Sequence, residues 1–416
     1  MTEPRTILTD ADLPVWRRRP EHRAWLMRQG NAILDFAQQA SIDPRGGFFE
    51  LDADGRPMPG ARQIHTTTRM VHCFVIAALL GRPGAADVID HGLTYLWSGH
   101  RDESHGGYMW SLQDGQPADD SKQAYGHGFV LLAAAGGKLV GHPLADRLFA
   151  DVAEVLDRRF WEENHGAFAE EFARDWSPIG GYRGQNSNMH LTEALMAAFE
   201  ASGEGLFLSR AERVAELVIG RHAAGNGWRL PEHFHADWEI DRAYRGADMF
   251  RPYGTTPGHS LEWARLLLQL WVLGGRRHDW MVGAARALFA CAVETSWDKA
   301  HGGFFYTLDW DDTPRNTAKL WWPAAEGIAA AAFLGEHDPS AFHEDWYRRI
   351  WNFTDRHFID HRRGGWFPEL DETLNPAQTL FAGKPDVYHS LQACLIPLYP
   401  ATGSLTAEII RAQRDG

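Results

Sequence analysis

The feature that most constrains this chain is a short glycine-rich segment that recurs six times along it. The segments read "DPRGGFFELD", "DESHGGYMWSL", "EENHGAFAEEF", "AAGNGWRLPEHF", "DKAHGGFFYTLD" and "DHRRGGWFPELD". Their glycine-equivalent positions are Gly46, Gly106, Gly166, Asn226, Gly302 and Gly364, which gives steps of 60, 60, 60, 76 and 62 residues. Such a period indicates repeated units, each of which buries its apolar face against its neighbours. The long step indicates an insertion of about 16 residues after the fourth segment.

Each unit contains the same succession of elements. A helical pattern with one apolar face comes first, as in residues 22–40 and 278–297. The glycine-rich segment follows and predicts a tight hairpin. The second helical pattern is rich in alanine and apolar on all sides, as in "GFVLLAAAGG" and "EGIAAAAFLG", which is typical of a buried helix.

Six helix pairs predict an all-α fold, an (α/α)6 barrel with short hairpins or loops at one end. We expect one catalytic domain over residues 1–416. An open superhelix of helix pairs is the alternative, because periodicity alone does not prove closure. Closure is favoured because six pairs can close a ring and neither end of the chain shows a polar capping unit.

Composition excludes several classes of partner. The net charge is −14 and the basic residues are scattered, so we expect no nucleic acid and no anionic membrane as partner. The N-terminal "MTEPRTILTDADLPVW" lacks the pattern of a secretion signal, and no apolar run approaches the length of a membrane span. Cys73, Cys291 and Cys394 are odd in number and lie in apolar contexts. They indicate reduced thiols, and the chain is predicted to be cytoplasmic.

The N-terminal ends of the six buried helices carry polar or aromatic side chains. In chain order these are Arg69, Tyr125, His190, His259, Trp322 with Glu326, and His389. Glu262 follows His259 by three residues, and Asn186 precedes His190 by four. A single histidine at a helix start is more often capped or solvated, but three at equivalent positions favour a shared pocket. Tyr125 and Trp322 could equally be core aromatics, and Glu326 could pair with Lys319.

Signals for metals and cofactors are weak. His233 and His235 form an H-x-H pair, but no third ligand stands at a diagnostic spacing. No phosphate-binding loop is present in the sequence: "GGKLVG" at 136–141 lacks the Walker spacing. We therefore expect neither a metal nor a cofactor.

The predicted site residues suit proton transfer next to a carbonyl. The helix dipole disfavours the imidazolium form at a helix N-terminus, so His259 beside Glu262 is a suitable general base. His389 across the pocket could return the proton, and Arg69 or Tyr125 could hold an oxyanion. Acting on an opened sugar, these groups would form a cis-enediolate. Return of the proton to C1 gives aldose–ketose isomerisation, and return to C2 from the opposite face gives 2-epimerisation.

The sequence resembles the N-acylglucosamine 2-epimerase family over nearly its whole length. The motifs are "TRMVHCFVIAALLGRPGA", "GQNSNMH", "YGTTPGHSLEWARL", "KLWWPAAEG" and "KPDVYHSLQACLIP". The resemblance implies an (α/α)6 barrel. It also implies a site made of Arg69, His190, His259, Glu262 and His389, with His259 and His389 as the acid/base pair and with Tyr125 and Asn186 at substrate-contacting positions.

Within that family the chain is most similar to bacterial aldose–ketose isomerases that act on mannose or on a sulfosugar. The sulfosugar type carries an arginine where this chain has Met249, so the resemblance implies a neutral monosaccharide and mannose/fructose interconversion. Sugar 2-epimerisation is the alternative. A glycoside hydrolase using Glu262, Glu326 and Asp386 is a further one, although it leaves three imidazoles without a role. A sugar-binding or protein-interaction role is the remaining option. We expect a monomer or a homodimer.

Overall fold

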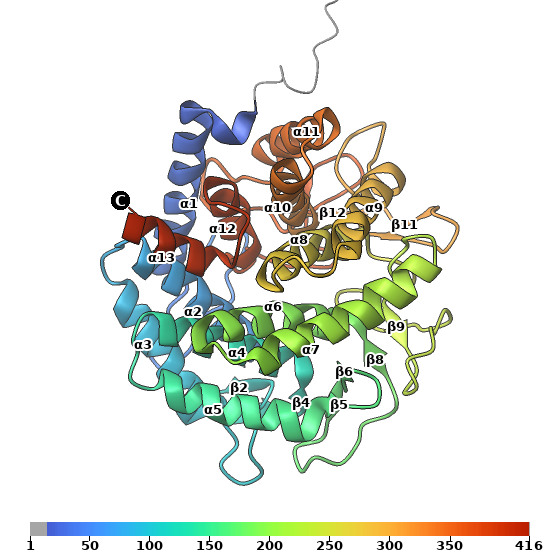
Figure 1. The fold of residues 1–416 in the computed structure, drawn as a ribbon. Helices are drawn as coiled ribbons and strands as arrows, with labels where there is room; N and C mark the ends of the chain where they lie inside the picture. The colour runs from blue at the N-terminus through green and yellow to red at the C-terminus, as the bar shows by residue number, and fades with distance from the viewer. Residues whose placement is uncertain (1–14, 416) are drawn as a thin grey trace, which may run out of the picture.

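The computed structural model describes residues 15–415, so the N-terminal residues 1–14, on which the prediction of no secretion signal mainly depends, lie outside the described part. Six helices form an inner ring (Figure 1). They are α2 (Ile64–Leu79), α4 (Ala124–Leu139), α6 (Gln185–Ser202), α8 (Pro257–Leu273), α10 (Trp321–His337) and α12 (Tyr388–Leu395). Each inner helix contacts the next, and α12 contacts α2. The ring is closed, which confirms the predicted (α/α)6 barrel.

Six further helices surround this ring. They are α1 (Pro20–Ala40), α3 (Ala85–Tyr95), α5 (Ala145–Val155), α7 (Gly205–Ala215), α9 (Trp280–Ser296) and α11 (Ala341–His357). Each outer helix from α3 onward packs on the inner helix that precedes it, and α1 packs on α12. Each outer helix therefore packs mainly on the inner helix of the preceding sequence unit, not on that of its own unit. The N-terminal helix α1 closes the outer layer by packing against α12, the last inner helix. After α12 the chain ends in α13 (Leu405–Asp415), which contacts α2.

The two layers differ in burial as their sequences predict. In α4 nearly every side chain is buried, and its alanines and glycines allow neighbouring helices to approach closely. In α1 the buried positions are only Leu26, Gly30, Ile33, Leu34 and Ala37, a stripe at helical spacing. Wide helical turns lengthen three outer helices, at Leu96–His100, Leu156–Phe160 and Glu216–Ala223. Single turns of 3-10 helix lie at Trp16–Arg18 and Ile396–Leu398.

Five of the six glycine-rich segments form the predicted hairpin. Antiparallel pairing flanks each of these turns. In the third segment β5 (Trp161–Glu162) pairs with β6 (Ala167–Phe168), and in the others single bridges join Ile42 to Phe48, Arg101 to Tyr108, Trp297 to Phe304 and Ile359 to Trp366. Gly47 shows why the turn needs glycine: its φ is +70°, and a Cβ there would lie 2.7 Å from the Tyr95 ring. The prediction is wrong for the fourth segment. Its chain stays helical past Ala223 and turns at Gly227, and no such pair is described there.

Short antiparallel links join the units around one rim of the barrel. They pair β1 (Arg62–Gln63) with β2 (Ser111–Gln113), β4 (Lys122–Gln123) with β7 (Glu171–Phe172), β8 (Arg183–Gly184) with β9 (His233–Phe234), and β12 (Lys319–Leu320) with β13 (Glu369–Leu370). Single bridges, Thr255–Leu308 and Leu51–Lys384, complete the circle. The remaining strands are local, β3 (Gln116–Asp119), β10 (Thr307–Leu308), β11 (Pro314–Asn316) and β14 (Pro376–Ala377). These links fix the strand before each inner helix, and so the height at which that helix begins.

Ion pairs tie five hairpins to these links, and all of them except Glu162–Arg183, which is partly exposed, are buried. An acidic residue at the start of the hairpin meets a basic residue just before an inner helix. The pairs are Asp43–Arg62, Asp102–Lys122, Glu162–Arg183, Asp298–Lys319 and Asp360–Lys384. In the second unit both partners have fully buried side chains. The possible pairing of Glu326 with Lys319 is wrong, because the Lys319 ammonium lies 3.0 Å from Asp298.

Two broader expectations can be compared with the described residues. No helix within residues 15–415 is long and apolar enough to span a membrane. The three cysteines are free thiols, two of them buried and Cys291 partly so. The single domain over residues 1–416 remains a prediction.

Candidate active site

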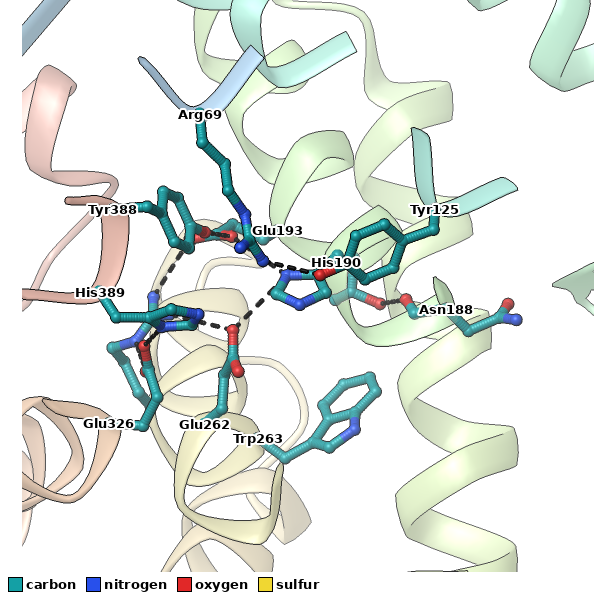
Figure 2. A network of polar contacts seen from close by, with 12 residues as sticks. Arg69, Tyr125, Asn188, His190, Glu193, Glu262, Trp263, Glu326, Tyr388 and His389 are labelled. Carbon is teal, nitrogen blue, oxygen red and sulfur yellow. Dashed lines mark hydrogen bonds and ion pairs between the residues drawn. The ribbon is translucent and has the colours of Figure 1, made fainter. Parts of the chain in front are cut away.

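The N-terminal ends of the six inner helices surround a pocket of about 460 Å³. Every predicted site residue except Glu326 lines it. The lining residues are Arg69, Tyr125, Asn186, His190, His259, Glu262, Trp322 and His389, together with Met249, Phe250, Tyr306, Trp321 and Phe381. Because all six inner helices begin at the same rim, residues more than 300 positions apart in sequence meet here (Figure 2).

His259 is paired with a carboxylate, but not with the one expected from the sequence. Its Nδ1 lies 2.8 Å from Oε2 of Glu232, which stands near the end of the fourth glycine-rich segment. The predicted partner, Glu262, has no hydrogen-bond partner among the described residues. His259 sits in the first turn of α8, where its ring turns back toward the chain before the helix instead of along the helix face. The ring stacks on Trp322 with centroids 4.9 Å apart.

His389 has an equivalent arrangement on the other side of Trp322. Its Nδ1 lies 2.8 Å from Oε1 of Glu326, and its ring centroid lies 6.1 Å from that of Trp322. Glu326 therefore sits behind the pocket and orients a histidine. The second oxygen of Glu326 accepts a hydrogen bond of 3.1 Å from Nε of Arg265. Two imidazoles, each held by a carboxylate at Nδ1, thus flank one indole.

His190 and Glu262 meet in the same pocket. His190 Nδ1 lies 3.6 Å from Glu262 Oε1. Burial lowers the pKa of His190 to about 4, so this imidazole is neutral at neutral pH. Burial and the neighbouring carboxylate of Glu326 raise the pKa of Glu262 well above its usual range. The neutral His190 can therefore form hydrogen bonds to a sugar without carrying charge, and the raised pKa of Glu262 favours its protonated form.

Arg69 occupies the wall between α2 and α4. Its guanidinium donates to Asp386 at 3.0 Å and to the Tyr125 hydroxyl at 2.7 Å. The cation also lies 4.5 Å from the centre of the Phe129 ring. Burial raises the pKa of Tyr125 to about 12, so its hydroxyl keeps its proton. Arg69 and Tyr125 together offer fixed donors toward one side of the pocket.

Arg265 joins three carboxylates below the pocket floor. It lies 3.1 Å from Glu326, 3.5 Å from Glu193 and 3.7 Å from Glu262. Tyr388 also donates a hydrogen bond to Glu193. Burial alone would raise the pKa of Glu193, but its contacts with His190 and Arg265 outweigh this and lower it. The guanidinium of Arg265 thus holds the three carboxylates together at the pocket floor.

Two parts of the chain carry potential metal ligands. In the H-x-H pair, both ring nitrogens of His233 are engaged, with the Tyr182 hydroxyl at 2.9 Å and the Pro252 carbonyl at 2.7 Å, so His233 offers no free ligand atom. Ligand atoms also gather within 4.8 Å of one another in two overlapping groups that share Glu262. The groups are His190, Glu193 and Glu262, and Glu262, Glu326 and His389. Arg265 lies against all three of these carboxylates and meets their charge.

Several residues of the site have little signal in the sequence. Glu232 stands in "EHFHADWE", where the histidines draw attention as possible ligands. Arg265 and Glu193 lie within otherwise apolar helices, and their three-residue spacing from Glu262 and His190 was their only signal. Phe250 and Met249 come from the insertion after the fourth segment, and Phe381 comes from the loop before α12. Position in the repeat could not identify them, because they lie outside it.

Comparison with known proteins agrees with this architecture. A family model described as N-acylglucosamine 2-epimerase matches residues 46–393. A D-mannose isomerase of Thermobifida fusca is 42% identical over 405 residues, which cover 95% of this chain and 99% of that protein. A crystal structure of a D-mannose isomerase superposes with a TM-score of 0.85 at 33% identity and covers 93% of this chain and 99% of that one. The cellobiose 2-epimerase of Spirochaeta thermophila shares the fold, with a TM-score of 0.81 at 23% identity over 91% of this chain and 96% of its own.

The match to the family model spans five of the six glycine-rich segments completely and begins inside the first. It also includes every predicted site residue, from Arg69 to His389. On this evidence the chain belongs to the N-acylglucosamine 2-epimerase family.

Proposed function

We propose that this protein is an aldose–ketose isomerase that interconverts D-mannose and D-fructose. The observation that carries the proposal is the pair of histidines, His259 and His389, each held at Nδ1 by a carboxylate and facing one pocket across Trp322. The similarity to proteins named D-mannose isomerase over nearly the full length of both chains agrees with this reaction class.

The reaction needs one proton moved between neighbouring carbons. One histidine takes the proton from C2 of the open-chain aldose, and the electron pair left behind forms the C1–C2 double bond of a cis-enediolate. The negative charge then lies on O1, where Arg69 and Tyr125 offer donors. Transfer of the O2 proton to O1 and return of a proton to C1 then give the ketose, with C2=O2 in place of the C1–C2 double bond. His259 and His389 are the proposed acid/base pair, and His190, Glu262, Asn186 and Trp322 the proposed substrate contacts.

The charges around the pocket favour a neutral sugar. Arg69, the one cation among the described pocket-lining residues, is already paired with Asp386. Arg251 lies in the insertion but is bound to Glu170 and Glu171 at 3.3 and 3.0 Å. The neighbouring lining residue is Met249, which offers no charge to an anionic substituent. A phosphate or sulfonate on the substrate would therefore find no free partner.

The two alternatives fit the site less well. A 2-epimerase would use the same histidines but return the proton to C2, and the similarity to isomerases is higher in identity than that to the epimerase. A glycoside hydrolase needs two carboxylates on either side of the scissile bond. Here Glu326 is engaged by His389 and Arg265, and Asp386 by Arg69.

The test is a reaction in deuterated buffer followed by NMR. We expect D-mannose to give D-fructose with deuterium at C1, in the presence of EDTA and with no nucleotide added. Formation of glucose from mannose without fructose would establish an epimerase instead. Release of reducing ends from mannosides would establish a hydrolase.

Replacement of His389 by alanine tests the site itself. We expect kcat for mannose to fall by about 10²–10⁴-fold, since this is the usual contribution of a positioned acid or base. A suitable control is His235→Ala, because His235 is exposed and does not line the pocket. Full activity of His389→Ala would exclude the proposed mechanism.

Two further properties belong to the proposal. We infer a cytoplasmic location, supported by three free thiols in a chain with no described disulfide. We also infer a monomer or a homodimer that acts on a monosaccharide. Light scattering of the purified protein measures the assembly, and a larger oligomer would contradict that inference.

A further inference from the structure

A chain of buried hydrogen bonds runs away from the pocket behind His259. It passes from His259 to Glu232, from Glu232 to Gln185 on α6, and from Gln185 to the indole of Trp263 on α8. We propose that Glu232, Gln185 and Trp263 are positioning residues that lock His259 in the tautomer with its proton on Nδ1. This inference rests on the proposed function only where it concerns activity.

The far end of the chain has a fixed polarity. An indole nitrogen can only donate, and Trp263 Nε1 lies 2.8 Å from Oε1 of Gln185. This contact sets the orientation of the Gln185 amide, which must present its oxygen to Trp263 and its NH₂ group to the other side. On that side, Gln185 Nε2 lies 2.8 Å from Oε2 of Glu232. Gln185 is therefore a donor to Glu232.

The other oxygen of Glu232 also receives a donor that cannot reverse. The backbone N–H of Thr256, the residue before α8, lies 3.2 Å from Oε1 of Glu232. With donors at both oxygens, Glu232 serves as an ionised acceptor. His259 Nδ1, 2.8 Å from Oε2, must then supply a proton to this contact. The neutral ring accordingly carries its hydrogen on Nδ1.

The consequence is that the neutral form of this ring presents an unprotonated Nε2, on a ring that lines the pocket. The stack on Trp322, at 4.9 Å and 30°, restrains the plane of the ring as well. Gln185 and Trp263 are fully buried, and Thr256 and Glu232 are nearly so. A protein group, not mobile water, therefore sets each step, and no member can rotate without leaving a buried polar atom unpaired. The free base position of His259 is thus set by an indole three hydrogen bonds away in the network.

His389 reaches the same tautomer by a different route. Glu326 accepts from Arg265 Nε at 3.1 Å, and a guanidinium also can only donate. His389 Nδ1 must then donate to Glu326 as well. A guanidinium orients the carboxylate behind His389, whereas a neutral amide and indole orient the carboxylate behind His259. The relay behind His259 can therefore be changed by substitution without altering the ion pairs of Arg265 in the pocket floor.

The direct test is NMR of the protein labelled with ¹⁵N in its histidines. Couplings between ring nitrogens and carbon-bound protons report which nitrogen carries hydrogen. The His259 signals are assigned by their loss in His259→Asn. We expect the neutral form of the wild-type ring to carry its hydrogen on Nδ1. Hydrogen on Nε2 would overturn the proposal, and this measurement needs neither substrate nor a stabilised variant.

Variants then test the relay. In Glu232→Gln the new amide must leave one buried donor facing another, either the Thr256 N–H or the Gln185 amide. In the double variant Glu232→Gln/Trp263→Phe, the Gln185 amide is free to turn. His259 Nδ1 can then accept from the NH₂ group of the introduced amide, and the ring hydrogen moves to Nε2. We expect this variant to lose less stability than the two single variants added together. It should nevertheless be less active than either.

The expected fall in kcat for the double variant is about 100-fold or more, since the wrong tautomer of a catalytic histidine costs up to about 10⁴-fold. KM should change little. Thr192→Val is the matched control, because it removes a fully buried hydrogen bond on α6, from the Thr192 hydroxyl to the Asn188 carbonyl, outside the relay. It should lower stability and leave both kcat and the tautomer unchanged.

The outcomes separate the two proposals. A double variant with the wild-type tautomer and wild-type kcat overturns the relay. The expected tautomer in a protein that isomerises no sugar leaves the relay in place and overturns the proposed function.

Discussion

The fourth repeat unit differs from the other five in what its acidic residue does. In five units an aspartate or glutamate at the start of the hairpin pairs with a lysine or arginine before an inner helix. In the fourth unit His222 stands at that position, and the turn is held by Asn226, whose amide donates to the Arg229 carbonyl at 2.8 Å. Its carboxylate, Glu232, comes later and points to His259.

This difference separates the part of the molecule that closes the ring from the part that does chemistry. The regular pairs set the height of the inner helices, and so place Arg69, His190 and His389 at one level. The irregular unit contributes Glu232 behind the pocket and the insertion that carries Met249 and Phe250 at its mouth. The fourth unit, which lacks the regular ion pair, is thus the unit that supplies both Glu232 and the insertion at the pocket mouth.

Acid should affect the regular units most, because it titrates several pairs at once. For Asp43, Asp102, Asp298 and Asp360, burial alone would raise the pKa, but the ion pairs outweigh it and lower each pKa. A lowered folded-state pKa adds stability that is complete above the unfolded value of about 3.9 and is lost as the pH falls through the folded value. We expect the free energy of unfolding in urea to drop steeply below about pH 4. A flat profile there would contradict the role given to these pairs.

Removal of one partner isolates a single pair. Lys319→Met leaves the nearly buried Asp298 without its cation, so we expect a loss of about 3–5 kcal/mol in the free energy of unfolding. Asp298→Asn/Lys319→Met should recover much of that loss. The matched change in the fourth unit is Asn226→Ala, which breaks a partly buried hydrogen bond to the Arg229 carbonyl and an exposed one from Arg242, and should cost only about 1 kcal/mol. Equal losses in unfolding free energy for Lys319→Met and Asn226→Ala would contradict the difference drawn between the regular units and the fourth unit.

Much of this architecture follows from local pattern. The glycine period predicted the number of units, and the alanine-rich helices predicted the inner ring, because both depend on short-range sterics and burial. The convergence of Arg69, His190, His259 and His389 followed from their equivalent places in the repeat. None of these inferences needed the identity of a distant partner.

The partners of the histidines could not be predicted in this way. Three-residue spacing suggested Glu262 for His259, but the ring at the first turn of α8 faces the preceding chain, where Glu232 lies 27 positions upstream. Glu326 and His389 are 63 positions apart. Such contacts depend on the angle between neighbouring helices, which the period does not specify. The fourth turn also departed from the pattern because its aspartate is absent.

Glu262 should change the pH dependence of stability less than the hairpin aspartates do, and in the opposite direction. Burial and the charge of Glu326 raise its pKa, so its contribution to stability is complete below the unfolded pKa and is lost as the pH rises through the folded value. We expect Glu262→Gln to become more stable relative to the wild type as the pH rises above about 4.3, the unfolded value for glutamate. Urea unfolding at pH 5 and pH 8 measures this difference. A difference independent of pH would mean that Glu262 is ionised in the folded protein.

Phe250 should have the smallest effect, because it belongs to the insertion and not to the ring. Its side chain is 44% exposed and meets Phe381 edge-on across the pocket mouth, with ring centroids 6.2 Å apart. Phe250→Ala removes one wall of the entrance but no group that touches the histidines, so we expect KM for mannose to rise a few-fold while kcat and the unfolding free energy stay nearly unchanged. Exposed positions of this kind usually shift stability by less than about 0.5 kcal/mol. A large fall in kcat would instead mean that the insertion helps to position the acid/base pair. The fourth unit would then affect the reaction both through the insertion at the pocket mouth and through Glu232.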